Sequence, residues 1–164
     1  MADPVSTAVN ETAAAAADPS FNLNRAYLKG ASIEMPNAPG IFLEQGAPDI
    51  EMEAQVARQH LDGDFHEVAV QVTLTARTNG KTLFLVEATQ AGIFTIENVP
   101  PADLAPLQEI VCAGIVFQYL RPNVADLITR MGLPPVHLSE VDFNAFYMAK
   151  LESASAESQT ATQQ

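Results

Sequence analysis

The sequence predicts an α+β fold, in which an antiparallel sheet forms first and helices follow it along the chain. Residues 65–77 alternate between apolar and polar side chains with a period of two, which is typical of a strand with one buried and one solvated face. After Pro100 and Pro101 the apolar spacing changes to the period of a helix. Strands that precede helices in this way favour helices packed on one face of the sheet.

The first strand is expected over 21–35. Its alternation is regular at Ala31, Ile33 and Met35, but Arg25 and Lys29 fall on the same, nominally apolar side. This conflict predicts a β-bulge or an edge position. Pro36 and Pro39 cannot join a central ladder, so residues 35–48 are expected to form an irregular crossing loop.

Three further strands are expected near 49–57, 65–77 and 81–90. Turns at Asp62-Gly63 and Asn79-Gly80 join them, and residues 91–96 extend the last strand past Gly92. Acidic side chains recur at the solvated positions of these strands. Such an open acidic sheet face is a surface for meeting another molecule rather than a chamber for catalysis.

A helix with apolar spacing is expected from residue 102 to Leu120, to be kinked or broken by Pro122 and resumed until Gly132. A short final helix starts near Asp142, which is a suitable N-cap. Residues 1–20 and 153–164 have too few large apolar side chains to pack, so both segments are expected to be disordered tails. The domain therefore spans residues 21–152.

Charge and composition restrict the function. The 164 residues suit one domain, and 20 acidic against 8 basic side chains give a net charge of −12. This field repels nucleic acid and anionic lipid and attracts basic chains, and solubility alone is the other explanation of an acidic surface. The single cysteine, the absence of signal-peptide features and the short apolar stretches indicate a cytoplasmic protein that does not insert into membranes.

Two groups of side chains were candidates for chemistry. His60, Asp62, Asp64 and His66 have ligand types that suit zinc, but the Asp-Gly-Asp segment is also what a hairpin turn requires. Cys112 lies in an apolar helical stretch, where a packed thiol is the common case. No phosphate loop, nucleophile elbow or paired-carboxylate motif is present, so no enzyme activity, cofactor or metal is predicted.

Two apolar connections are unusual for loops. They are Ile41-Phe42-Leu43 in the crossing loop and Leu133-Pro134-Pro135 after the long helix. Both could plug the core, or both could line an exposed groove that attracts unfolded polypeptide. Composition alone leaves both alternatives open.

Ordered matches along residues 21–151 resemble one known family, the bacterial protein-export chaperone SecB. The most specific is the segment 32–39, Ser-Ile-Glu-Met-Pro-Asn-Ala-Pro. Others are Val-Thr-Leu-Thr-Ala at 72–76, Gln-Ala-Gly-Ile-Phe at 90–94, and Arg-Met-Gly-Leu-Pro-Pro at 130–135. Val-Asp-Phe-Asn-Ala at 141–145 completes the resemblance.

The resemblance implies a four-stranded antiparallel Greek-key sheet with helices on one face, assembled as a homotetramer, a dimer of dimers. It implies a chaperone that binds unfolded precursor proteins, keeps them competent for translocation and delivers them to the motor ATPase SecA. It also implies that Phe84, Val86 and Ala88 pack under helices near the assembly interface.

Site residues follow from the same resemblance. Glu34, Leu85 and Glu87 match positions that dock SecA. The groove for unfolded substrates is expected between residues 39–48 and 133–138, lined by Ile41, Phe42, Leu43, Leu133, Pro134 and Leu138. The chain departs from the family pattern at Gly30, where an acid is common, at Gly46, where tryptophan is common, and at Pro122, so the long helix is expected to bend at a different place.

Two alternatives belong to other functional classes. One is a chaperone of the same fold that holds a single dedicated client, such as an antitoxin. The other is a small-ligand or metal-dependent enzyme built around His60 and His66.

Overall fold

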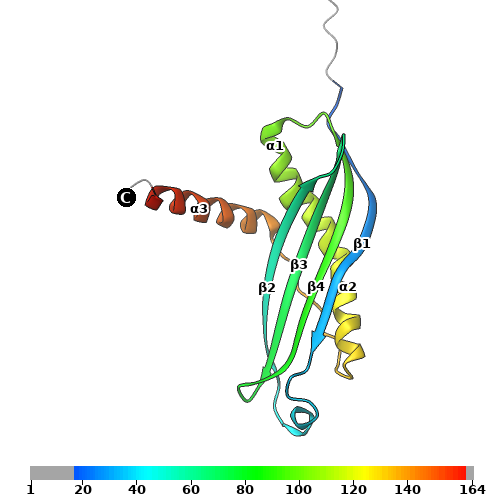
Figure 1. The fold of residues 1–164 in the computed structure, drawn as a ribbon, viewed down its shortest axis with the longest axis vertical. Coiled ribbons are helices and arrows are strands. Elements are labelled where there is room, and N and C mark those ends of the chain that lie inside the picture. Colours follow the sequence, from blue (N-terminus) through cyan, green and yellow to red (C-terminus); the bar gives the residue numbers. More distant parts are fainter. Residues whose placement is uncertain (1–16, 162–164) are drawn as a thin grey trace, which may run out of the picture.

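The computed structural model describes residues 17–161, which form a four-stranded antiparallel sheet with helices against one face (Figure 1). The strands are β1 (Ser20–Glu34), β2 (Asp49–His60), β3 (Phe65–Thr78) and β4 (Lys81–Glu97). Their lateral order is β1-β4-β3-β2, so three hairpin-connected strands are completed by the first strand beside the last. This is Greek-key order, and the expected α+β class is confirmed.

Strand β1 has both features that its irregular pattern predicts. It lies at the edge of the sheet, and its pairing with β4 shifts register between Leu23 and Arg25 and again between Leu28 and Gly30. These shifts turn Arg25 toward the open face, opposite Ile93. A cationic side chain on the apolar parity is thereby kept out of the core.

The three other strands are longer than expected at their ends. Asn79 and Gly80 adopt φ angles of 52° and 76°, the left-handed pair that a tight hairpin turn requires. Strand β4 continues past Gly92 without interruption, so the predicted extension over 91–96 is confirmed. Gly92 is buried and lies directly beneath the long helix.

The helical half is one continuous run. Helix α1 (Pro101–Pro106) passes into a π-helical turn, η2 (Leu107–Cys112), and then into α2 (Ala113–Arg130). The sequence predicts a kink or a break at Pro122. The predicted break is wrong, because α2 continues through Pro122 to Arg130. A proline inside a helix costs roughly 3 kcal/mol, whereas each large apolar side chain buried on the sheet contributes about 1.5–3 kcal/mol. Helix α2 buries several, and Pro122 itself is exposed.

The core lies between α2 and the inner sheet face. It contains the inward-pointing side chains of β3 and β4 and one stripe of α2, namely Val68, Val70, Val72, Leu74, Phe84, Val86, Ala88, Val116, Phe117, Leu120, Val124 and Ile128. Phe84, Val86 and Ala88 are buried on this inner face, under the helical half, as expected. Their place near an assembly interface stays a prediction.

Helix α3 (Phe143–Ala161) points away from the sheet (Figure 1). Asp142 caps it as predicted, because its Oδ1 accepts a hydrogen bond of 3.0 Å from the backbone amide of Ala145. The helix continues beyond residue 152, where the sequence predicts the ordered part to end. Alanine and glutamate after that point are good helix formers, which favours the extension. The other predicted tail residues, 1–16 and 162–164, lie outside the described residues.

A buried carboxylate fixes the start of α3. Glu109 in η2 has a side chain only 3% exposed, and it lies 2.9 Å from Arg58 Nε of β2 and 2.6 Å from Lys150 Nζ of α3. A buried charge needs such partners, so this ion pair network joins three elements. Among residues 17–161, no helix is both long and apolar enough to span a membrane.

Candidate functional site

A cleft forms where the crossing loop meets the end of the helical half. The loop contains a short 3-10 helix, η1 (Gly40–Leu43), and faces the connection 133–136 that follows α2. Between them is a cavity of about 400 Å³, called here the loop cleft. Its lining is mostly apolar and consists of Ile41, Phe42, Glu44, Gly46, Pro48, Ile50, Thr78, Leu83, Phe84, Leu133, Pro134, Pro135 and Val136.

The structure divides the predicted groove residues into three groups. Ile41, Phe42, Leu133 and Pro134 line the loop cleft. Leu43 is 86% exposed and does not line it. Leu138 is buried and borders a separate depression beside Arg121 and Pro122.

The crossing loop could plug the core or line an exposed groove, and two neighbouring residues of η1 differ in this respect. Ile41 is only 4% exposed and belongs to the core, so it acts as a plug. Phe42 is 50% exposed and presents its ring at the cleft. An apolar side chain left accessible beside a concave apolar wall is a feature of binding sites for apolar groups.

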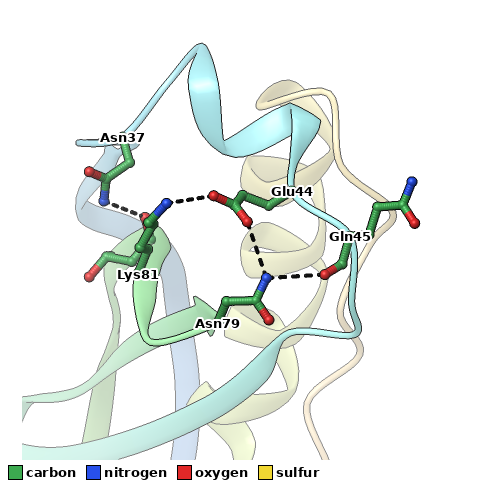
Figure 2. A network of polar contacts seen from close by, with 6 residues as sticks. Asn37, Glu44, Gln45, Asn79 and Lys81 are labelled. Carbon is green, nitrogen blue, oxygen red and sulfur yellow. Dashed lines mark hydrogen bonds and ion pairs between the residues drawn. The ribbon is translucent and has the colours of Figure 1, made fainter.

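Polar contacts hold the crossing loop against the turn between β3 and β4 (Figure 2). Glu44 Oε1 accepts a hydrogen bond of 2.6 Å from Lys81 Nζ, and its Oε2 accepts one of 3.1 Å from Asn79 Nδ2. Asn79 Nδ2 also donates to the carbonyl oxygen of Gln45 at 3.2 Å. These hydrogen bonds, first that from Lys81, lower the pKa of Glu44 from its ordinary value.

Several cleft residues were not predicted as such. Leu83 falls on the solvated side of β4 by simple alternation, yet it is buried and lines the cleft. The pairing of β3 with β4 shifts register between Ala76 and Arg77, and this irregularity interrupts the alternation at that end of the hairpin. Ile50 falls on the apolar side of the alternating pattern of β2, so the sequence indicates that it points inward but not that it lines the cleft.

The three residues proposed for docking are neighbours on the open sheet face. Glu34 pairs directly with Leu85 across β1 and β4, and Glu87 lies two residues further along β4, on the same face. Both carboxylates are exposed and Leu85 is half-buried. We call these three residues the sheet-face patch. In register, Leu85 lies beside Thr75, whose partner in β2 is Glu51.

Negative charge at this end of the open face comes from Glu34 and Glu87, whereas Glu51 is paired with Arg77, whose Nη1 lies 2.6 Å from Glu51 Oε2. Further along, the carboxylate of Glu67 is buried and neutralised by Lys29, whose Nζ lies 2.5 Å away. Burial and the neighbouring Glu67 raise the pKa of Tyr27 on the same face. Gly30 is paired with Thr89, and a Cβ atom there would meet no heavy atom within 4 Å, so the position has room for a side chain.

The residues that were candidates for metal binding or catalysis, His60, His66 and Cys112, are not arranged for either chemistry. The rings of His60 and His66 lie 4.9 Å apart, but His60 Nε2 already donates to the carbonyl oxygen of Gly63 at 2.7 Å. Burial lowers the pKa of His66, and His60 adds to this shift. Within residues 17–161, no three histidine, cysteine or acidic side chains are grouped so that they could hold a metal. Burial raises the pKa of the Cys112 thiol to about 12, which makes it a poor nucleophile.

Comparison with known proteins gives concordant matches. A family model described as "Preprotein translocase subunit SecB" matches residues 14–154. The chain is similar to "Protein-export protein SecB" of Bordetella avium strain 197N, with 51% identity over 144 residues, 87% of this chain and 84% of the relative. The protein of the same description from Burkholderia vietnamiensis strain G4 is 50% identical over 133 residues, 81% of this chain and 84% of the relative.

One solved structure supports the fold. It is described as the Mycobacterium tuberculosis Rv1957 SecB-like chaperone in complex with a ChAD peptide from the Rv1956 HigA1 antitoxin. The match has a TM-score of 0.62 at 16% identity and covers 74% of this chain and 90% of the other. At this identity the likeness shows the fold alone.

Proposed function

Since the chain belongs to the SecB family of protein-export chaperones, we propose that the loop cleft is where it holds unfolded precursor proteins. The observation that carries the proposal is the half-exposed Phe42 beside a cavity walled by Leu133 and Pro134. Apolar side chains of a client gain roughly 25 cal/mol per Å² of surface buried there. A cavity of about 400 Å³ has room for only a few side chains, so each contact is weak and generic.

Holding requires no energy input. A protein that binds the unfolded state delays folding by mass action alone, and several clefts on one assembly retain a long client through effective concentration. The chain is accordingly proposed to act by binding, without turnover chemistry. A net charge of −12 favours encounter with basic segments of precursors.

The proposal includes partners and location. We assign the sheet-face patch to docking of SecA. SecA would then take over the client for export, and the encounter would take place in the cytoplasm.

We also propose a homotetramer of two dimers. Large apolar side chains exposed on β1 and α2 support self-association, among them Phe21, Leu28, Ile33 and Tyr119. Light scattering should then give a mass of about 70 kDa, four times the 17.6 kDa of one chain.

A dedicated client is less well supported than a range of precursors. Identity near 50% over most of the chain connects it to protein-export proteins of two genera. The SecB-like chaperone that is described with an antitoxin peptide shares 16% identity. Competition between unrelated unfolded proteins would distinguish a general chaperone from a dedicated one.

The cleft is tested with an environment-sensitive fluorophore attached to a Phe42→Cys variant. Cys112 is buried with a raised pKa, so the new thiol is the one that reacts. Addition of reduced and carboxymethylated α-lactalbumin, a permanently unfolded chain, should shift the emission of the label. The matched control is Leu43→Cys, one residue away and outside the cleft lining, where a smaller shift is expected. Equal shifts at both positions, or none, would refute the assignment of the cleft.

A further inference from the structure

The two walls of the loop cleft differ in how they are held. One wall is the connection 133–136, in which two consecutive prolines restrict the backbone. The other wall is the crossing loop, whose internal bonds close only short turns, such as Ile41 N to Asn37 O at 2.9 Å and Glu44 N to Ile41 O at 3.2 Å. The position of the crossing loop therefore depends on what ties it to the sheet.

Two side chains tie the loop at opposite ends. At its start, Asn37 Nδ2 donates to the carbonyl oxygen of Thr82 at 3.0 Å. At its end, both carboxylate oxygens of Glu44 are engaged by Lys81 and Asn79 of the β3–β4 turn (Figure 2). Between these ties lie the buried Ile41 and the half-exposed Phe42. Glu44 also lines the cleft, so the tie is part of the wall that it holds.

We propose that Glu44 is a positioning residue, a latch that fixes the crossing loop against the β3–β4 turn and so sets how fast a client leaves the loop cleft. This proposal rests on the proposed function of the cleft. When Glu44 is released from Lys81 and Asn79, the loop stays attached through Ile41, Asn37 and the hydrogen bond from Asn79 to the carbonyl oxygen of Gln45. Phe42 can then move away from the opposite wall.

The contacts of this latch suit repeated opening. The Lys81 side chain is 58% exposed, and ion pairs in water are weak and are screened by salt. A strong buried pair would hold the loop permanently, whereas this pair leaves a small open population. Losing it should raise the open population roughly three- to tenfold, the low end of what an ion pair and one hydrogen bond together provide, because both contacts are exposed to water.

The test uses four full-length variants. Glu44→Gln removes the charge, Lys81→Met removes the partner, and the double variant Glu44→Lys with Lys81→Glu restores an ion pair of opposite polarity. The matched control is Asp126→Asn, which breaks an exposed pair with Arg130 at 2.8 Å on α2, outside the cleft lining. Each is compared with the unmodified chain for amide hydrogen exchange in residues 40–46 and for the dissociation rate of reduced and carboxymethylated α-lactalbumin.

The expected result is that Glu44→Gln and Lys81→Met speed both exchange of the loop and dissociation by about three- to tenfold, as estimated for the open population. The charge-swapped variant should return both rates toward those of the unmodified chain, and Asp126→Asn should change neither. Faster exchange with unchanged dissociation overturns the latch, and so does unchanged exchange.

The Phe42 label is read in parallel. If the label reports client binding but the latch variants dissociate normally, only the latch is wrong. If the label reports none, the cleft assignment fails and the latch fails with it.

Discussion

Gly92 allows helix α2 to lie directly on the sheet. A Cβ atom there would lie 2.8 Å from Phe94 Cε2 and 3.0 Å from both Leu23 Cδ1 and Val116 Cγ2. Gly92→Ala should therefore overpack the core and lower the free energy of unfolding by about 1–3 kcal/mol. Urea unfolding at equal protomer concentration measures it, with Gly30→Ala as the control because that position is open. Equal stability of the two variants would contradict this account.

Cys112 is predicted to be inert in the folded protein. Its thiol is fully buried under the core, and with a pKa of about 12 roughly one molecule in ten thousand carries a thiolate at pH 8. A disulfide reagent whose reaction with the Cys112 thiol is measured by absorbance should modify the native chain slowly. It should modify the urea-unfolded chain within seconds. Fast stoichiometric modification of the native protein would show that the helical half opens readily.

Single residues also show how far sequence patterns reach. Alternation identifies Val68, Val70, Val72 and Leu74 of β3 correctly as buried, because a regular antiparallel strand keeps its period of two. It places Glu67 on the solvated side, although Glu67 is buried there against Lys29. It places Leu83 on the wrong side, because the register shift next to Arg77 depends on pairing with another strand. The difference between Ile41 and Phe42 is equally invisible in the sequence, since two adjacent apolar residues of a loop diverge only once η1 forms.

Among the elements, the contact between the crossing loop and the β3–β4 turn is predicted to depend on acid pH. Hydrogen bonds from Lys81 and then Asn79 depress the pKa of Glu44, so the contact stabilises the folded loop above the unfolded pKa, near 4.5. That stabilisation is lost as the pH falls through the lower pKa of the folded state. The nuclear magnetic resonance signal of the Asn79 side-chain amide should follow this titration, with a midpoint below 4.5.

The same titration in a Lys81→Met variant supplies the comparison. Without the principal donor, the midpoint should rise toward the ordinary value of a glutamate. Identical midpoints in both proteins would mean that Lys81 does not determine the charge state of Glu44. The other carboxylates of the chain contribute equally to both measurements, so the difference between them isolates this one contact.

Helical elements show where local rules are overridden. Pro122 and Pro106 both lie inside the helical run, although proline disfavours a helix interior. The run continues because its buried face packs against β3 and β4, and a π-helical turn, η2, follows Pro106 directly. The same turn carries Glu109, whose two cationic partners come from β2 and α3. No periodicity in the sequence could have joined these three positions.

For the whole subunit, the sequence predicts the topology class and the two segments of the cleft, but not which surface pairs with another copy. The resemblance covers residues 21–151, and its expected Greek-key order matches the observed order β1-β4-β3-β2. Phe84, Val86 and Ala88 are buried on the inner sheet face, beneath the helical half, and their place near an assembly interface stays a prediction.

The last prediction concerns the division of the molecule into two surfaces. The sheet-face patch lies on the open face of the sheet, whereas the loop cleft lies at the end where the crossing loop meets the helical half. Because the two surfaces share no residue, charge reversal of Glu34 and Glu87 to lysine should weaken SecA binding by roughly tenfold or more. Binding of reduced and carboxymethylated α-lactalbumin should stay within about twofold, since neither carboxylate lines the cleft and salt screens exposed charges.

Calorimetry with purified SecA and with the unfolded chain measures the two affinities separately. The control reverses Asp62 and Asp64 in the β2–β3 turn, which makes the same change in net charge away from both surfaces. If net charge alone steered SecA, both double variants would lose affinity equally. If SecA and the unfolded chain compete for one surface, the Glu34 and Glu87 variant loses both affinities together while light scattering still gives the unchanged assembly. Selective loss of SecA binding is the result that two separate surfaces require, because a client must stay held while the motor docks.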